Sequence, residues 1–207
     1  MSSTELLALL ALAAVGTFTP GPNTALSATL AANHGWRRAM PFVCAVPVGW
    51  GILLILNAAG LGVVVLGFPP LRWGLLAASM MYLMWLAFKL ASTQGLSEAS
   101  QGPIVGFKEG IMLQFINIKA WFLALSVASG WVIGHDNTLA RLLIALPIFM
   151  LFGLASNLTY VCIGASLRHW LRGPNDTAQR LQWFNRLMAL TLLATVVWMT
   201  HSALSLS

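Results

Sequence analysis

Residues 6–36 read LLALLALAAVGTFTPGPNTALSATLAANHGW, a run that contains no Asp, Glu, Lys or Arg. A helix needs about 20 predominantly apolar residues to cross the hydrocarbon core of a bilayer, so this run can span one. Backbone polar groups in lipid must pair within their own segment, which makes an α-helix the expected conformation. The run therefore predicts an all-α membrane protein.

The composition and the remaining sequence support this prediction. Charged residues make up 8% of the 207 residues and hydrophobic residues 58%, whereas soluble domains carry about 25% charged residues. A soluble enzyme, a nucleic-acid-binding protein and a disordered protein are therefore disfavoured. Five more runs are free of Asp, Glu, Lys and Arg, apart from Lys119 in the third of them: 39–71, 73–88, 111–135, 142–167 and 187–207. We predict a polytopic protein with six transmembrane helices in a single transmembrane domain, residues 1–207.

The basic residues between the spans predict the orientation, because Lys and Arg concentrate in cytoplasmic loops. The loops after spans 1, 3 and 5 hold eight of them: Arg37, Arg38, Lys89, Lys108, Arg168, Arg172, Arg180 and Arg186. The loops after spans 2 and 4 hold only Arg72 and Arg141. We therefore expect the loops after spans 1, 3 and 5 to lie in the cytoplasm and both termini to lie outside.

A polar segment separates the first three spans from the last three. It reads STQGLSEASQGPIV at residues 92–105, and its small and polar residues predict a linker. An odd number of spans in each half gives the halves opposite orientations, which is the arrangement of an inverted repeat. We expect one half at about residues 1–91 and the other at about residues 106–207, a 3+3 inverted repeat.

The motif TPGPN at residues 19–23 lies near the middle of the first span. Pro20 and Pro22 cannot donate backbone hydrogen bonds, so the carbonyls of Gly16 and Phe18 lose their usual helical partners. Such groups are tolerated at membrane depth only beside protein or a wet cavity. We predict a broken helix from Thr19 to Asn23, with a second half-helix whose positive N-terminal end could hold a substrate carboxylate. The alternative is a structural kink packed against a neighbouring helix.

The fourth span contains a second polar cluster. Gln114 and Asn117 are three residues apart and share a helix face. Lys119 lies deep in the span, where a charge costs about 2.5–3.5 kcal/mol on insertion scales. No span contains an interior Asp or Glu, so Lys119 is expected to pair with the freed carbonyls of the first span, with polar side chains, or with a ligand carboxylate. The alternative is that Lys119 only fastens two helices together.

The sequence therefore predicts that the following residues bind the substrate or line its translocation path: Thr19, Pro20, Gly21, Pro22, Asn23, Gln114, Asn117 and Lys119. Asn57, Tyr82 and Asn157 are weaker candidates, because each could equally bridge two helices. The histidines show no ligand spacing, and we expect no metal, no cofactor and no haem. Phosphate-binding loops and nucleophile motifs are not present in the sequence, so we expect a protein that is not an enzyme.

Several of these motifs resemble one family across nearly the whole chain. The sequence resembles the LysE/RhtB family of bacterial amino-acid exporters in TPGPN at 19–23, GWRRA at 35–39, Tyr82-Leu83 ahead of Lys89, and NIKA at 117–120. The last motif departs from the usual Asn-Pro-Lys pattern. Its Ile118 can donate an N–H, so we expect helix 4 to be distorted near Asn117, with less reason for a break than in helix 1. LQFINIK at 113–119 and SNL at 156–158 are similar to the cysteine and O-acetylserine exporter branch.

The resemblance implies a secondary transporter of the bacterial cytoplasmic (inner) membrane. Such a protein would export a small amino acid or derivative from the cytoplasm, coupled to protons or to another ion. Because Lys119 is the deep charged side chain and no span holds an interior carboxylate, we expect Lys119 to be the group that would exchange a proton. Two other classes stay open: a non-transporting membrane scaffold subunit, and a membrane redox protein that uses Cys44 and Cys162, both expected to be buried. A homo-oligomer also stays open, because stretches of small residues can mediate contacts within or between protomers.

Overall fold

A computed structural model describes residues 1–92, 105–173 and 179–204, and every regular element in these residues is a helix. The elements are α1 (Ser3–Phe18), α2 (Pro22–His34), α3 (Trp36–Ala58), α4 (Leu61–Gly67), α5 (Pro69–Ser92), α7 (Phe107–Ile116), α8 (Ile118–Val127), the π-helix η1 (Ala128–Val132), α9 (Thr138–Arg172) and α10 (Gln179–Leu204). The all-α class is therefore confirmed. The predicted linker, residues 92–105, lies outside the described residues except at its two ends.

The number of membrane spans is confirmed in part. Among the described residues, α3, α5 and α9 are each long and apolar enough to cross a membrane, and two bent helix pairs bring the number to as many as five. The helix α10 has 26 residues, about 39 Å at the usual helical rise, but its sequence is less apolar than the three long spans. Six spans and the 3+3 repeat therefore stay predictions.

The first bent pair confirms the predicted break in helix 1. The first half, α1, ends at Phe18, the second half, α2, begins at Pro22, and their axes differ by 51°. Both prolines act as expected, because one lies in the gap and the other occupies the first turn of α2, where the missing N–H costs nothing.

The second bent pair is sharper than the sequence suggested. The axes of α7 and of α8 with η1 differ by 71°, and Asn117 between them is extended (φ −89°, ψ 97°). Ile118 is not a proline, yet the break persists because side chains satisfy the carbonyls that it frees. Trp121 Nε1 donates to the Phe115 carbonyl at 2.7 Å, and the Ser79 hydroxyl of α5 donates to the Ile116 carbonyl. The stabilising donors come from tertiary structure, which a local motif does not reveal.

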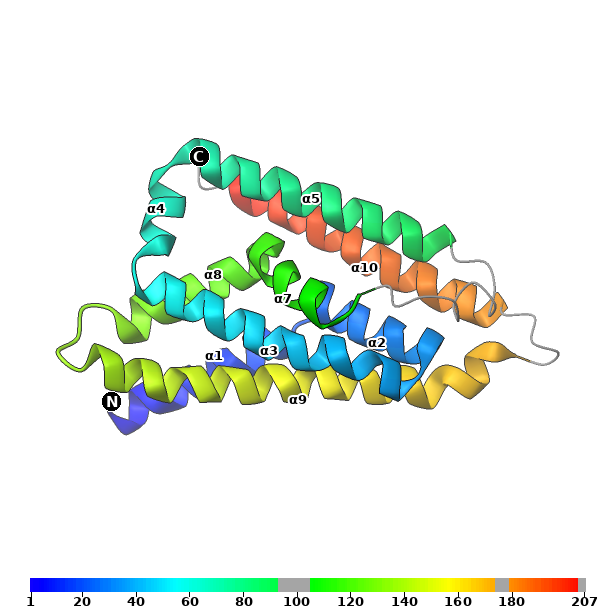
Figure 1. Ribbon diagram of the computed structural model, residues 1–207, viewed down its shortest axis with the longest axis horizontal. Helices are drawn as coiled ribbons and strands as arrows, with labels where there is room; N and C mark the ends of the chain where they lie inside the picture. The colour runs from blue at the N-terminus through cyan, green and yellow to red at the C-terminus, as the bar shows by residue number, and fades with distance from the viewer. Residues whose placement is uncertain (93–104, 174–178, 205–207) are drawn as a thin grey trace.

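The half-helix α2 lies at the centre of the bundle. All of its residues except Asn23 are buried, and it packs against α9, α3 and α10. Figure 1 shows α5 and α10 side by side along one edge, with α1, α2, α3 and α9 forming the other part. α2 approaches α9 closely at Gly164, where an added Cβ would overlap the Ala28 carbonyl oxygen.

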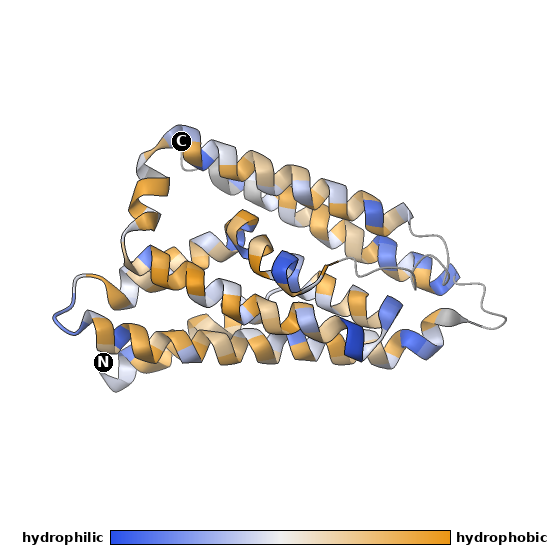
Figure 2. Ribbon diagram, viewed as in Figure 1, coloured by the Kyte–Doolittle hydropathy of each residue, from blue (hydrophilic) through white to orange (hydrophobic). Residues whose placement is uncertain are grey.

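The helix ends that carry most of the basic residues lie at one end of the bundle. The junction of α2 with α3, the C-terminal ends of α5 and α9, and the start of α10 are all at the right in Figure 1, where Figure 2 shows hydrophilic residues. The N-terminus, α4 and the turn between η1 and α9 are at the opposite end. This separation agrees with the alternation expected of membrane spans; which end faces the cytoplasm stays a prediction.

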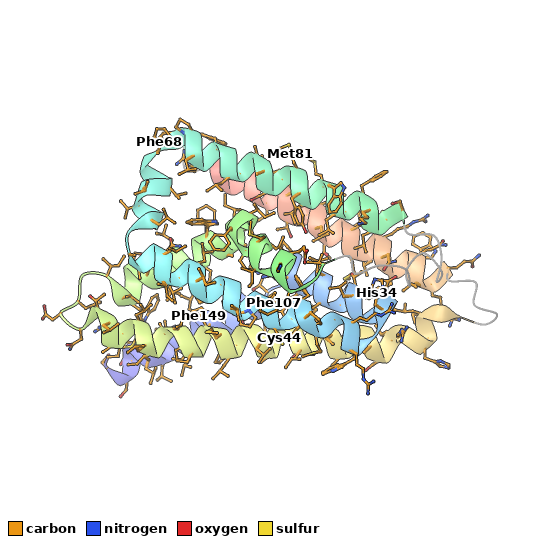
Figure 3. All side chains as sticks on the ribbon, in the orientation of Figure 1. His34, Cys44, Phe68, Met81, Phe107 and Phe149 are labelled. Atoms are coloured by element: carbon orange, nitrogen blue, oxygen red, sulfur yellow. The ribbon has the colours of Figure 1, made fainter. Side chains whose placement is uncertain are left out.

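The expectation that both cysteines are buried is wrong. Cys44 of α3, labelled in Figure 3, and Cys162 of α9 are both exposed. Their apolar neighbours suggested a core position, but the lipid-facing side of a membrane helix is as apolar as its packed side. Apolar flanks therefore do not indicate burial in a chain of this kind.

Replacement of Gly164 by alanine should destabilise the protein, because the new methyl group meets a backbone oxygen that cannot move aside. We expect overpacking of about 1–3 kcal/mol and a Tm lower by about 2–10 °C, measured by thermal unfolding in detergent. The matched control is Gly74→Ala in α5, where an added Cβ meets nothing within 4 Å and where alanine favours the helix. Equal Tm values for the two variants would contradict the close packing of α2 on α9.

Candidate functional site

The two helix breaks face one cavity of about 60 Å³ at the centre of the bundle, which we call the central cavity. Its walls include Thr19, Gly21, Pro22 and Asn23 at the first break and Asn117 and Lys119 at the second. One water molecule needs about 10–15 Å³ of such space, so this cavity has room for a few small polar groups. Six of the eight residues nominated from the sequence thus border it, and Pro20 and Gln114 do not.

The C-terminal end of α1 presents a row of backbone carbonyls, each with a side-chain donor from another helix. The Thr17 carbonyl accepts from Ser156 Oγ at 2.8 Å, and the Phe18 carbonyl accepts from Tyr160 Oη at 3.2 Å. The Thr19 carbonyl accepts from Lys119 Nζ at 2.7 Å. The sequence predicted that the Gly16 and Phe18 carbonyls are freed and that Lys119 pairs with such carbonyls. The Phe18 carbonyl does take a side-chain donor, whereas Lys119 bonds the neighbouring Thr19 carbonyl.

Two helix N-termini meet the same cavity. Gly21 caps α2 and Asn117 caps α8, and both line the cavity with residues of the following first turn. The N–H groups of a first helical turn have no intrahelical partner and carry a positive partial charge. The Asn117 Oδ1 atom is buried and has no hydrogen-bond partner among the described residues. The site therefore combines two positive helix ends, one negative helix end and an unused amide oxygen.

Lys119 is half-buried and lies against the backbone of the first break. A Cβ added at Gly21 would come within 3.4 Å of Lys119 Nζ, so glycine leaves room for the ammonium group. Among the described residues the only salt bridge joins Arg141 to Glu5 at 3.3 Å, and no described carboxylate pairs with Lys119. Its charge is balanced by carbonyl dipoles alone, which leaves the site without a formal negative charge.

Gln114 does not line the central cavity, but its hydrogen bonds link the two helix breaks. Asn23 Nδ2 donates to Gln114 Oε1 at 2.9 Å, and Gln114 Nε2 donates to Asn23 Oδ1 at 3.1 Å and to the Gly110 carbonyl at 3.1 Å. Gln114 is fully buried. Its side chain therefore orients Asn23 and does not face the cavity itself.

The three weaker candidates, Asn57, Tyr82 and Asn157, lie in different parts of the structure. Asn157 of α9 borders the central cavity, where its Oδ1 accepts from Ser27 Oγ at 2.8 Å. Asn57 lies instead in a smaller cavity formed with residues of α4, α5 and α8. Tyr82 packs against Trp85 with ring centroids 5.7 Å apart and borders neither cavity.

Sequence reasoning did not nominate the donors on α9. Ser156 and Tyr160 are four residues apart and so share a helix face, and both reach the end of α1. That spacing of two hydroxyls inside an apolar run is a usable signal, because polar side chains in membrane spans can hydrogen-bond across helices. The stacked pair Trp50 and Phe149, with ring centroids 4.8 Å apart, forms an apolar wall of the cavity and was also missed.

Comparisons with known proteins agree with the resemblance drawn from the motifs. The family model described as "LysE type translocator" matches residues 14–201. The cysteine/O-acetylserine efflux protein of Escherichia coli (strain K12) is 26% identical over 165 residues, which cover 79% of this chain and 84% of the relative. The protein of the same name from Salmonella typhimurium (strain LT2) is 26% identical over 162 residues, 76% of this chain and 83% of the relative. No solved structure matches the chain.

The reciprocal bond between Asn23 and Gln114 should appear as a coupling energy. Asn23→Ala and Gln114→Ala, made singly and together, should show about 0.6–1.7 kcal/mol of coupling in the free energy of unfolding, the range for such bonds in membranes. The control cycle pairs Gln114→Ala with Asn185→Ala, since Asn185 instead bonds Asn33, and should be additive. Additivity in the first cycle would show that the two amides do not hold the breaks together.

Proposed function

The chain belongs to the LysE type translocator family, and on that premise we propose that it exports a small amino acid or amino-acid derivative from the cytoplasm in exchange for a proton. The observation that carries this proposal is the meeting of two broken helices at one small cavity, with both signs of helix dipole and a lysine. The relatives are named as efflux proteins for cysteine and O-acetylserine, and this supports the substrate class.

The central cavity is complementary to a zwitterion. The substrate carboxylate would lie at the N-terminal ends of α2 and α8. Asn23 lies in the first turn of α2, and Asn117 is the N-cap of α8. The substrate ammonium would lie at the carbonyl end of α1, where Lys119 Nζ now bonds the Thr19 carbonyl. The first break would act through the backbone exposed by Thr19, Pro20, Gly21 and Pro22. The site would therefore recognise the carboxylate and the ammonium group that amino acids share.

Lys119 supplies a route for coupling. Its ammonium occupies the position proposed for the substrate ammonium, so the two compete for the Thr19 carbonyl. When a substrate binds from the cytoplasm, Lys119 gives up that bond and releases its proton to the cytoplasm. When the substrate leaves to the outside, Lys119 takes a proton from that side and returns to Thr19. One proton then enters for each substrate exported, and an inward proton gradient drives export.

The proposed setting is the bacterial inner membrane, with the basic end of the bundle in the cytoplasm and both termini outside. Residues 1–91 and 106–207 would form the two inverted halves, each beginning with a bent pair: α1 with α2, and α7 with α8. Because the breaks of both halves face one cavity, a rocking of one half against the other would open the cavity to each side in turn.

Lys119→Arg tests the exchange, because arginine keeps its charge and cannot readily lose a proton. We expect this variant to reach the membrane and to unfold near the wild-type Tm. We also expect the initial rate of gradient-driven efflux from loaded proteoliposomes to fall about tenfold or more, with little remaining dependence on the pH gradient. The control is Lys108→Ala at the exposed start of α7, which should export as the wild type does.

Two results would count against the role of Lys119. Efflux by Lys119→Arg with an unchanged dependence on the pH gradient would show that Lys119 is not the proton carrier. Normal efflux by Lys119→Ala would remove the functional role of the site around Asn117 and Lys119. A Lys119→Ala variant that assembles normally but exports nothing would exclude the scaffold subunit.

Single cysteines test the orientation. In a Cys44→Ser, Cys162→Ser background, we expect a membrane-impermeant maleimide to label Asn137→Cys from outside intact cells and to label His169→Cys only after permeabilisation. Both positions are exposed, at opposite ends of α9. The reverse labelling pattern would invert the proposed topology. The background also tests the redox class, since a protein that works through its thiols would lose activity in it.

A further inference from the structure

A second, larger cavity shares residues with the central cavity. It has a volume of about 490 Å³, against about 60 Å³ for the central cavity. Its walls are Thr19, Pro20 and Lys119 from the two breaks and Thr191, Ala194, Thr195 and Trp198 from α10; we call it the α10 vestibule. Thr19 and Lys119 line both cavities, so the hydrogen bond between them lies where the two spaces meet.

The α10 wall of the vestibule is apolar in spite of its threonines. Thr191 Oγ1 donates to the Met188 carbonyl at 2.7 Å, and Thr195 Oγ1 donates to the Thr191 carbonyl at 2.9 Å. Because both hydroxyl protons are used within the helix, α10 offers mainly methyl groups and the indole ring of Trp198. This surface suits an apolar or weakly polar group of side-chain size.

Lys119 adds a charge restriction. It is the only ionisable side chain among the residues that line the vestibule. A cationic group that enters the vestibule while Lys119 still holds its proton would meet the ammonium without any lining carboxylate to offset the repulsion. Once Lys119 has lost its proton, the lining residues still offer that cationic group no negative charge. An uncharged group meets no such barrier.

We propose that the α10 vestibule is the subsite for the substrate side chain, and that α10 therefore selects uncharged amino acids by the size of that side chain. This inference rests on the proposed function, because it takes the substrate ammonium and carboxylate to occupy the central cavity. About 60 Å³ admits those groups and little more, so the rest of the substrate needs the adjoining space. Pro20 would belong to this side-chain subsite, since it lines the vestibule and not the central cavity.

Filling the vestibule should change selectivity and leave the exchange intact. In proteoliposomes loaded with alanine, methionine, leucine or lysine, the wild type should export the uncharged amino acids and not lysine. Thr195→Leu should lower efflux of methionine and leucine at least about tenfold and change alanine efflux by less than about twofold, as expected for a pocket that loses room for a few methylenes. Trp198→Ala, which enlarges the vestibule, should raise the ratio of leucine to alanine efflux.

The matched control is Thr159→Leu on the exposed face of α9. Thr159 Oγ1 donates to the Ala155 carbonyl at 2.8 Å, the same intrahelical bond that Thr195 makes, but it lines neither cavity. If Thr195→Leu fails to reach the membrane, Thr195→Cys in the background without Cys44 and Cys162 replaces it. Methyl and benzyl methanethiosulfonate should then reduce leucine efflux in order of their size.

The outcomes separate this inference from the proposed function. A wild type that exports alanine, together with Thr195 and Trp198 variants whose selectivity equals that of Thr159→Leu, would overturn the subsite and leave the exporter standing; the vestibule would then be filled by lipid. Export of lysine at the rate of alanine would overturn the charge restriction. A wild type that exports no amino acid with or without a pH gradient would remove the proposed function, and the subsite with it.

Discussion

Backbone groups that leave a helix at membrane depth must find new partners, and this requirement shapes the centre of the molecule. The carbonyls of Thr17 and Phe18 are satisfied by two hydroxyls of α9, and the last carbonyls of α7 by an indole of α8 and a hydroxyl of α5. Except for Trp121, which lies six residues after Phe115, these partners lie on helices that are far apart from the breaks in the sequence. The breaks therefore persist only when the bundle has closed around them, which joins the geometry of the site to the global fold.

The same centre is short of negative charge. A lysine at this depth costs about 2.5–3.5 kcal/mol on insertion scales, whereas a hydrogen bond between membrane helices contributes about 0.6–1.7 kcal/mol. The bond from Lys119 to the Thr19 carbonyl therefore offsets only part of the cost, and the C-terminal dipole of α1 adds about 0.3–1 kcal/mol. The N-terminal ends of α2 and α8 act in the opposite sense, because they carry positive partial charge. A carboxylate would balance these groups, and the described part of the chain provides none at this position.

Local chemistry explains which features could be predicted from the sequence. The break at TPGPN was predictable, because a proline removes a donor whatever surrounds it, and the depth of Lys119 followed from counting residues. A distortion near Asn117 was predicted, but its extent as a full break was not, because the break depends in part on Ser79, which lies on another helix. Gln114 was predicted to contact the substrate, but its hydrogen bonds to Asn23 depend on where the fold places α7 relative to α2. Burial of the cysteines was mispredicted, since hydropathy does not distinguish a lipid-facing helix surface from a packed one. The exact number of spans also depends on α10, where the apolar signal is weaker.

Under the proposed function, the central cavity and the α10 vestibule have different roles, because different groups line them. At the first break the central cavity presents backbone carbonyls and amides, which any sequence that keeps the break would present in the same way. The vestibule presents side chains of α10, which can change without disturbing a helix break. Under the proposed function, relatives that share only 26% of their residues with this chain could keep the recognition of an amino acid while the wall that meets its side chain differs. Family membership would then be informative about the export of amino acids in general, and α10 would determine which amino acid is exported.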